Sequence, residues 1–152
     1  MNIFEEVKSL NFPLGGYLVL GSGPMAARGI RGYKDIDILV TQKLYDKLVE
    51  QGWKAVEING VNEKFEVLKN GKFEIDKKIN CGNYNPDIET LIKNAEIING
   101  VPFLPLNELI KFKTALGREK DFQDIKLIKE YLKNNSIDIN MPQICAQRYK
   151  KI

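Results

Sequence analysis

The sequence predicts an α+β fold with one domain over residues 1–133. Short apolar runs of strand length alternate with segments of helical periodicity, and two Asn-Gly pairs, at 70–71 and 99–100, are typical of β-hairpins. A chain of 152 residues is also long enough for one hydrophobic core and short for two. Residues 134–152 lose the periodicity and end in a group of basic side chains, so we expect a basic C-terminal tail there.

The first half of the chain alternates helices and strands. A helix with apolar residues at helical spacing is expected within 1–10, followed by a buried strand at 17–20 and a glycine turn that enters a short helix. The next strand, 35–40, places Ile36, Ile38 and Val40 on one face and two aspartates on the other. Thr41 then caps a helix that ends before Gly52.

The second half contains the two hairpins and three further helices. Residues 64–69 and 72–76 flank the first Asn-Gly turn, and 96–98 and 101–104 flank the second. Pro86 and Asp87 open a helix between the hairpins. Two helices follow, at 106–116 and about 120–132, with Gly117 between them.

Composition limits the chemistry. With 43% hydrophobic and 28% charged residues, the chain is typical of a soluble globular protein, and a net charge of +3 permits an anionic ligand without indicating a dedicated nucleic-acid binder. The chain has no histidine, which excludes Ser-His-Asp and Cys-His pairs and His-ligated zinc. Catalysis would therefore rest on carboxylates, lysine, arginine, hydroxyls or a hard metal ion.

Cysteine usage and hydropathy favour a cytoplasmic location. Cys81 and Cys145 lie far apart in the sequence, and we expect both to be buried or idle thiols. No apolar run is long enough to span a membrane, and no secretory segment is recognisable. We therefore expect no membrane partner.

The most informative pattern is a strand that ends on Gly21 and Ser22, followed after twelve residues by Asp35 and Asp37. Glycine lets the backbone approach a phosphate closely, and the start of a helix offers N–H donors to an anion. Two aspartates on one strand face, with Cα atoms ~7 Å apart, can converge on Mg²⁺. In isolation, Gly-Ser-Gly is usually only a turn and Asp-x-Asp a surface strand edge; the combination favours a phosphate and metal site.

A third carboxylate would complete a two-metal site, and Glu74 and Asp76 are both candidates because they share a face of the strand at 72–76. Only one of them can lie level with the two aspartates. We expect Glu74, whose longer side chain reaches further. Asp76 lies further toward Lys77 and Lys78, and these are expected to hold it as an exposed ion pair.

This combination resembles the signature of the DNA polymerase beta-like nucleotidyltransferase superfamily. The matching segments are Gly21-Ser22, the twelve-residue spacer and Asp35-Ile36-Asp37-Ile38. Gly29-Ile30-Arg31 looks like the minimal bacterial and archaeal nucleotidyltransferases, including the antibiotic-modifying and AbiEii-type toxin branches. Residues 109–115, with Lys113, and the run Arg118-Glu119-Lys120-Asp121 with Asp124 resemble the C-terminal motif of the same group. Gly23-Pro24 departs from the more usual Ser-Ala-Arg-type continuation.

The resemblance implies a mixed, twisted β-sheet backed by helices and a Mg²⁺-dependent nucleotidyltransferase. ATP or another nucleoside triphosphate would be the donor, two Mg²⁺ ions the cofactors, and an unknown hydroxyl or phosphate the acceptor. The resemblance assigns the triphosphate to Gly21 and Ser22, phosphate neutralisation to Arg31 and Lys113, and metal binding and catalysis to the three acids, which are Asp35, Asp37 and Glu74. Glu74 would also be the base toward the acceptor.

The sequence leaves the acceptor and the activity open. The acceptor could be a small molecule, RNA or a protein, and an RNA acceptor could be steered by the basic tail. The alternative function is a catalytically silent nucleotide-binding or partner-binding module of the same fold, such as a component of a toxin–antitoxin or defence pair. Retention of all three acids favours the enzyme, because clustered carboxylates without a cation repel one another. The oligomeric state is not predicted.

Overall fold

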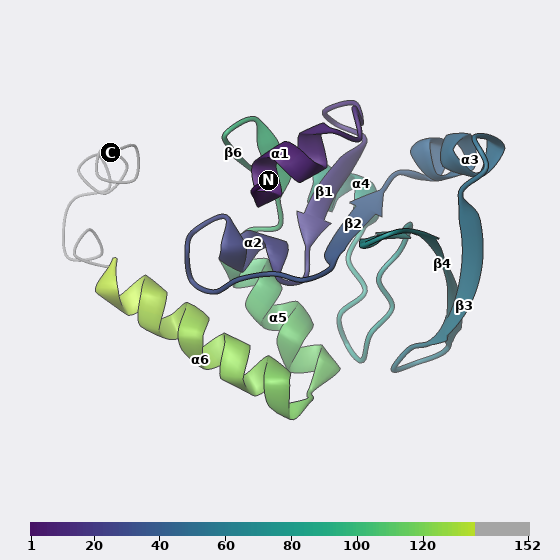
Figure 1. Cartoon of the computed structure of the whole chain (residues 1–152). Coiled ribbons are helices and arrows are strands. Elements are labelled where there is room, and N and C mark those ends of the chain that lie inside the picture. The colour runs from purple at the N-terminus through teal and green to yellow at the C-terminus, as the bar shows by residue number, and fades with distance from the viewer. Residues whose placement is uncertain (136–152) are drawn as a thin grey trace.

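The computed structural model describes residues 1–135, which form a seven-stranded mixed β-sheet and six α-helices (Figure 1). The α+β class is therefore confirmed. The last helix runs through Asn134, so the predicted boundary at 133 falls within its final turn. The basic tail and Cys145 lie in residues 136–152, outside the described residues.

The helices and strands follow the predicted order, with one further strand at Lys54–Asn59 that was not predicted. The helices are α1 (Ile3–Lys8), α2 (Gly23–Ala26), α3 (Gln42–Glu50), α4 (Ile88–Lys93), α5 (Leu106–Leu116) and α6 (Glu119–Asn134). The strands are β1 (Tyr17–Leu20), β2 (Ile36–Val40), β3 (Lys54–Asn59), β4 (Lys64–Asn70), β5 (Phe73–Asp76), β6 (Glu96–Ile98) and β7 (Val101–Phe103). Both predicted hairpins are present, as β4–β5 and β6–β7.

The sheet has the strand order β3-β4-β5-β2-β1-β7-β6, with β2 at its centre. Strand β2 pairs antiparallel with β1 and parallel with β5. The parallel pairing places Asp37 opposite Glu74 and Leu39 opposite Asp76. Residues that are paired in a ladder project to the same face, so the acids of β2 and β5 share one side of the sheet.

Each face of the sheet packs into its own hydrophobic cluster. On one face, Ile36, Ile38 and Val40 pack with buried residues of α1 and α3. On the other face, Leu39 of the same strand joins Leu18 and Leu20 of β1 and buried residues of α4, α5 and α6. The alternation predicted for 35–40 is therefore confirmed, and the aspartates lie on the face that α5 and α6 partly cover.

Local signals set several helix boundaries. Thr41 caps α3 by accepting a hydrogen bond from the Leu44 N–H at 3.3 Å, and Asp87 caps α4 by accepting one from the Thr90 N–H at 3.0 Å. Gly117 ends α5 in a left-handed conformation. Within residues 1–135, no helix combines the length and the apolar composition needed to cross a membrane.

Candidate active site

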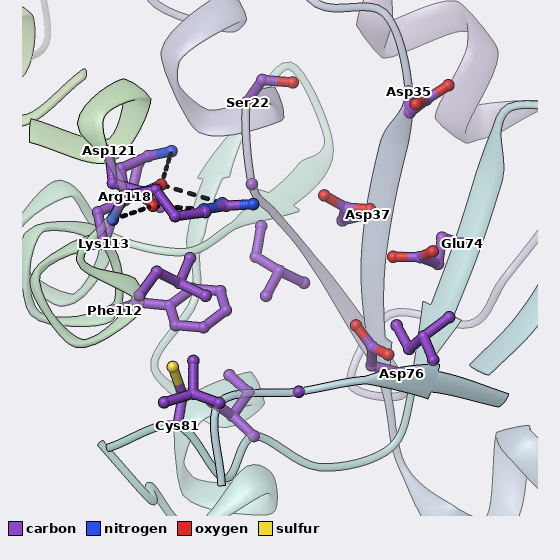
Figure 2. Close-up of a pocket in the computed structure, with 18 of the residues that line it drawn as sticks. Ser22, Asp35, Asp37, Glu74, Asp76, Cys81, Phe112, Lys113, Arg118 and Asp121 are labelled. Atoms are coloured by element: carbon purple, nitrogen blue, oxygen red, sulfur yellow. Dashed lines mark hydrogen bonds and ion pairs between the residues drawn. The ribbon is translucent and has the colours of Figure 1, made fainter. Parts of the chain in front are cut away.

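A cleft of about 610 Å³ lies between the acidic face of the sheet and the helices α5 and α6. Its lining includes every site residue predicted from the sequence: Gly21, Ser22, Arg31, Asp35, Asp37, Glu74, Asp76 and Lys113. These residues come from five separate segments of the chain, which the fold brings to one place. In Figure 2, the four acids follow one wall of the cleft, and Lys113, Arg118 and Asp121 lie on the opposite wall.

The glycine turn at the end of β1 makes room for an aspartate. Gly21 has a φ of 69°, and a Cβ at this position would overlap the Oδ2 of Asp37 and lie 3.2 Å from its Cγ. Gly23 is needed for a different reason, since a Cβ there would overlap the side chain of Val19. The turn therefore seats α2 against β1 and lets the Asp37 carboxylate approach the backbone.

Ser22 precedes α2, and its hydroxyl makes no capping hydrogen bond to the helix. Helix α2 has only four residues, so its dipole attracts an anion less strongly than the sequence predicts. What the turn offers to an anion is chiefly the Ser22 hydroxyl and the close approach of the backbone.

The acids form a row along β2 and β5. Asp37 and Glu74 are level in the ladder, Asp35 precedes β2 and is exposed, and Asp76 ends β5 (Figure 2). Glu74 therefore has the position expected of the third carboxylate, while its role stays a prediction. Among the described residues, the one ion pair to this row joins Lys69 Nζ and Glu74 Oε1 at 3.8 Å.

Burial and mutual repulsion perturb the row. Burial raises the pKa of Asp37 to about 7, assisted by the negative charges of Glu74 and Asp35 and opposed by Lys113. Burial also raises the pKa of Asp76 well above its usual range, again assisted by Glu74 and Asp37. Lys69 and Lys113 offset this repulsion only in part, and a divalent cation would offset it further.

The residues present fit a hard cation in part. Carboxylate oxygens are the ligands that Mg²⁺ prefers, and the Oδ1 of Asp76 is buried with no hydrogen-bond partner among the described residues. Within residues 1–135, however, no three acidic or thiol side chains already converge as a metal-binding group. Substrate oxygens or side-chain rotation would have to complete the coordination.

The predicted exposed ion pair of Asp76 with Lys77 and Lys78 is wrong. Lys78 instead pairs with Glu63, with 2.6 Å between Nζ and Oε1, and Lys77 Nζ lies 4.6 Å from the centre of the Tyr45 ring. Asp76 turns away from both lysines because its ladder partner, Leu39, faces the cleft side of the sheet. This register could not be known from residues 72–76 alone.

On the opposite wall, Arg31 and Lys113 both donate hydrogen bonds to the carboxylate of Asp124. Lys113 is only 5% exposed, and its Nζ donates to Asp124 Oδ2 at 2.8 Å. Arg31 donates from Nε and Nη2 to the two oxygens of Asp124 at 2.8 and 2.9 Å. Burial alone would raise the pKa of Asp124, but these hydrogen bonds outweigh it, and the net pKa lies below the usual value.

Asp124 therefore holds both predicted phosphate-binding cations in place. The sequence pattern included Asp124 in the quoted motif without giving it this role. Asp121, on the same helix, binds the Arg118 backbone N–H and guanidinium and caps α6, and Lys113 Nζ lies 3.9 Å from its Oδ1. The cationic side chains of Arg31, Lys113, Arg118 and Lys120 outnumber the carboxylates of Asp121 and Asp124 there, which leaves a positive balance for an anion.

A third wall comes from the turn between β3 and β4, which no motif in the sequence connects with the site. The Asn62 amide donates to Asn80 Oδ1 at 2.8 Å and to Gly82 O at 3.1 Å, and Asn62 Oδ1 accepts from the Gly82 N–H at 2.9 Å. Together with the Lys78–Glu63 pair, these bonds fix the turn to the segment after β5. Figure 1 shows β3 and β4 as a curved ribbon on the side of the molecule away from α6.

No family model, curated protein or solved structure matches this chain in the three comparisons with known proteins.

Proposed function

We propose that the protein is a Mg²⁺-dependent nucleotidyltransferase that moves a nucleoside monophosphate from a nucleoside triphosphate to an acceptor hydroxyl. The observation that carries this proposal is the parallel pairing of β2 with β5. It sets Asp37 level with Glu74, beside the Gly21 turn and across the cleft from Lys113. The resemblance of the sequence motifs to the polymerase beta-like superfamily supports the same function.

The chain's own residues divide into two roles. Arg31 and Lys113, steadied by Asp124, bind the triphosphate together with the Ser22 hydroxyl. Asp35, Asp37 and Glu74 are the residues that would hold Mg²⁺. When bound, this metal would neutralise the acids and stabilise charge on the phosphate oxygens.

The proposed transfer forms one bond, breaks one bond and moves one proton. A bond forms between the acceptor oxygen and the α-phosphorus, and the bond from that phosphorus to the oxygen bridging the β-phosphate breaks, releasing pyrophosphate. Glu74 accepts the proton of the acceptor hydroxyl. Because Glu74 lies level with Asp37, its carboxylate could help to hold Mg²⁺ and also accept the proton of the acceptor.

Label transfer from each of the four α-³²P-labelled nucleoside triphosphates tests the proposal, with small molecules, RNA and proteins offered as acceptors. We expect transfer that needs Mg²⁺ or Mn²⁺ and is abolished by Asp37→Asn. Asp46→Asn, which changes an exposed aspartate on α3, should transfer label like the wild type. Triphosphate binding without transfer to any acceptor class would favour the silent nucleotide-binding module instead.

A further inference from the structure

The two ends of the cleft differ in chemistry. The end near the Gly21 turn carries Ser22, Arg31 and Lys113, whereas several apolar side chains line the end near the β3–β4 turn, beside the polar residues Asn59, Glu63, Lys78 and Asn80. The apolar end is lined by Ile58, Val61, Phe65, Ile79, Phe112 and Leu116. We name these six residues the apolar end of the cleft.

Contacts across the segment after β5 show that these residues belong together. Asn62 of the β3–β4 turn is hydrogen-bonded to Asn80 and Gly82. Gly82 in turn lies against α5, since a Cβ on it would be 3.6 Å from the Ala115 side chain. The segment therefore bridges the β3–β4 hairpin and the C-terminal part of α5, which together supply all of the apolar end except Ile79.

Asp76 lines the cleft beside this end, and one of its carboxylate oxygens has no hydrogen-bond partner within residues 1–135. It is the last residue of β5, and the segment that follows it runs directly into the apolar end. Its Oδ1 is buried and accepts no hydrogen bond from the part of the chain that the structure describes, and both neighbouring lysines make other contacts. In Figure 2, Asp76 ends the acidic row on one wall, and Phe112 and Cys81 lie on the other side of the cleft.

A buried carboxylate oxygen without an internal donor is costly, and a ligand that brings an N–H donor removes the cost. A phosphate or carboxylate at this position would be repelled by Asp76 and Glu74. A cationic amine would be attracted, and an apolar body attached to it would bury the surfaces of Val61 and Phe112.

We propose that the apolar end and Asp76 form the acceptor half of the site, and that the acceptor is a small apolar molecule bearing an amine that binds Asp76. This inference rests on the proposed function, which places the triphosphate at the Gly21 end of the same cleft. A cleft of about 610 Å³ is within the range that holds small ligands. The acceptor's reacting hydroxyl would lie toward Glu74, two residues before Asp76 on β5.

Binding of a probe tests the inference without nucleotide or metal, so its outcome is separate from that of the transfer assay. The probes are 2-phenylethylamine and its neutral analogue 2-phenylethanol, titrated into ¹⁵N-labelled full-length protein and followed by amide chemical shifts. We expect the amine to shift signals around Asp76, Ile79 and Val61, and the alcohol to bind at least about tenfold more weakly.

Two matched pairs of variants locate the probe. Asp76→Asn should weaken amine binding about tenfold or more, while Asp46→Asn, at an exposed position of α3, should leave it within twofold. Val61→Ser should weaken binding several-fold, while Val56→Ser should not, because both valines are exposed but only Val61 lines the cleft. Circular dichroism checks that each variant is folded.

Three outcomes would overturn the inference. Equal binding of the amine and the alcohol would show that charge does not contribute to binding. Chemical-shift changes confined to other surfaces would show that the amine does not bind in the cleft. A loss of Mn²⁺ affinity in Asp76→Asn, with amine binding unchanged, would make Asp76 a metal ligand. Failure of label transfer with intact amine binding would count against the proposed function and leave the amine site standing.

Discussion

Gly21→Ala is the substitution whose cost can be worked most closely from the geometry. Two effects add at this position. A side chain at a φ of 69° costs about 1–2 kcal/mol, because left-handed backbone places Cβ too near the carbonyl oxygen. The Cβ would also overlap the Asp37 carboxylate, and forcing a packed group aside costs about 1–3 kcal/mol more.

Gly29→Ala is the matched control. Gly29 has a φ of 71°, and a Cβ on it would meet nothing within 4 Å, so this variant is destabilised only by the strain of the left-handed backbone. In urea denaturation, the two variants should show the same dependence of the free energy of unfolding on urea concentration. The free energy of unfolding of Gly21→Ala should be about 1–3 kcal/mol lower than that of Gly29→Ala. In an Asp37→Ala background, the difference between the two should nearly vanish. Equal costs in the wild-type background would refute the contact between Gly21 and Asp37.

Four further outcomes are expected. Raising the pH from 5 to 8 without metal should lower the free energy of unfolding, because the pKa of Asp37 is raised to about 7 in the folded state and that of Asp76 is raised as well; in denaturant titrations, Asp37→Asn should remove the part of this dependence that is due to Asp37. Asp124→Asn should cost about 3 kcal/mol by removing the nearer of the two carboxylates beside the buried Lys113, and adding Lys113→Met should recover part of that loss. Mg²⁺ should raise the melting temperature appreciably only when a triphosphate is present, since no three acids already form a metal-binding group within residues 1–135; equal shifts without nucleotide would argue against a shared site. Glu74→Gln should lower kcat by about 10²-fold, whereas Asp76→Asn should chiefly raise KM for the acceptor, and a reversal of these two effects would exchange their roles.

Local signals account for most of the fold that could be predicted. The Asn-Gly turn at 70–71 determines the β4–β5 hairpin, and the alternation in 35–40 determines which face of β2 is acidic. Both depend only on neighbours in the sequence. Strand order is different, because the parallel pairing of β2 with β5 joins segments that no short-range pattern connects.

The same distinction explains what was missed in the site. The position of Asp76 depends on its pairing with Leu39, so an exposed ion pair with Lys77 and Lys78 was a reasonable but wrong expectation. The convergence of Arg31 and Lys113 on Asp124 depends on how α5 and α6 pack beside the turn after α2. No sequence motif indicates the apolar end of the cleft around Val61. It depends on the hydrogen bonds that Asn62 makes with distant residues in the folded chain.

Paired labels on the triphosphate test the central claim most directly. In parallel reactions with α-³²P-labelled and γ-³²P-labelled nucleoside triphosphate, the account predicts that the α-label moves to the acceptor and the γ-label leaves as pyrophosphate. Both events should need divalent metal and should be lost in Asp37→Asn, with its fold intact. Transfer of the γ-label to the acceptor, or α-label transfer that survives Asp37→Asn, would contradict the account.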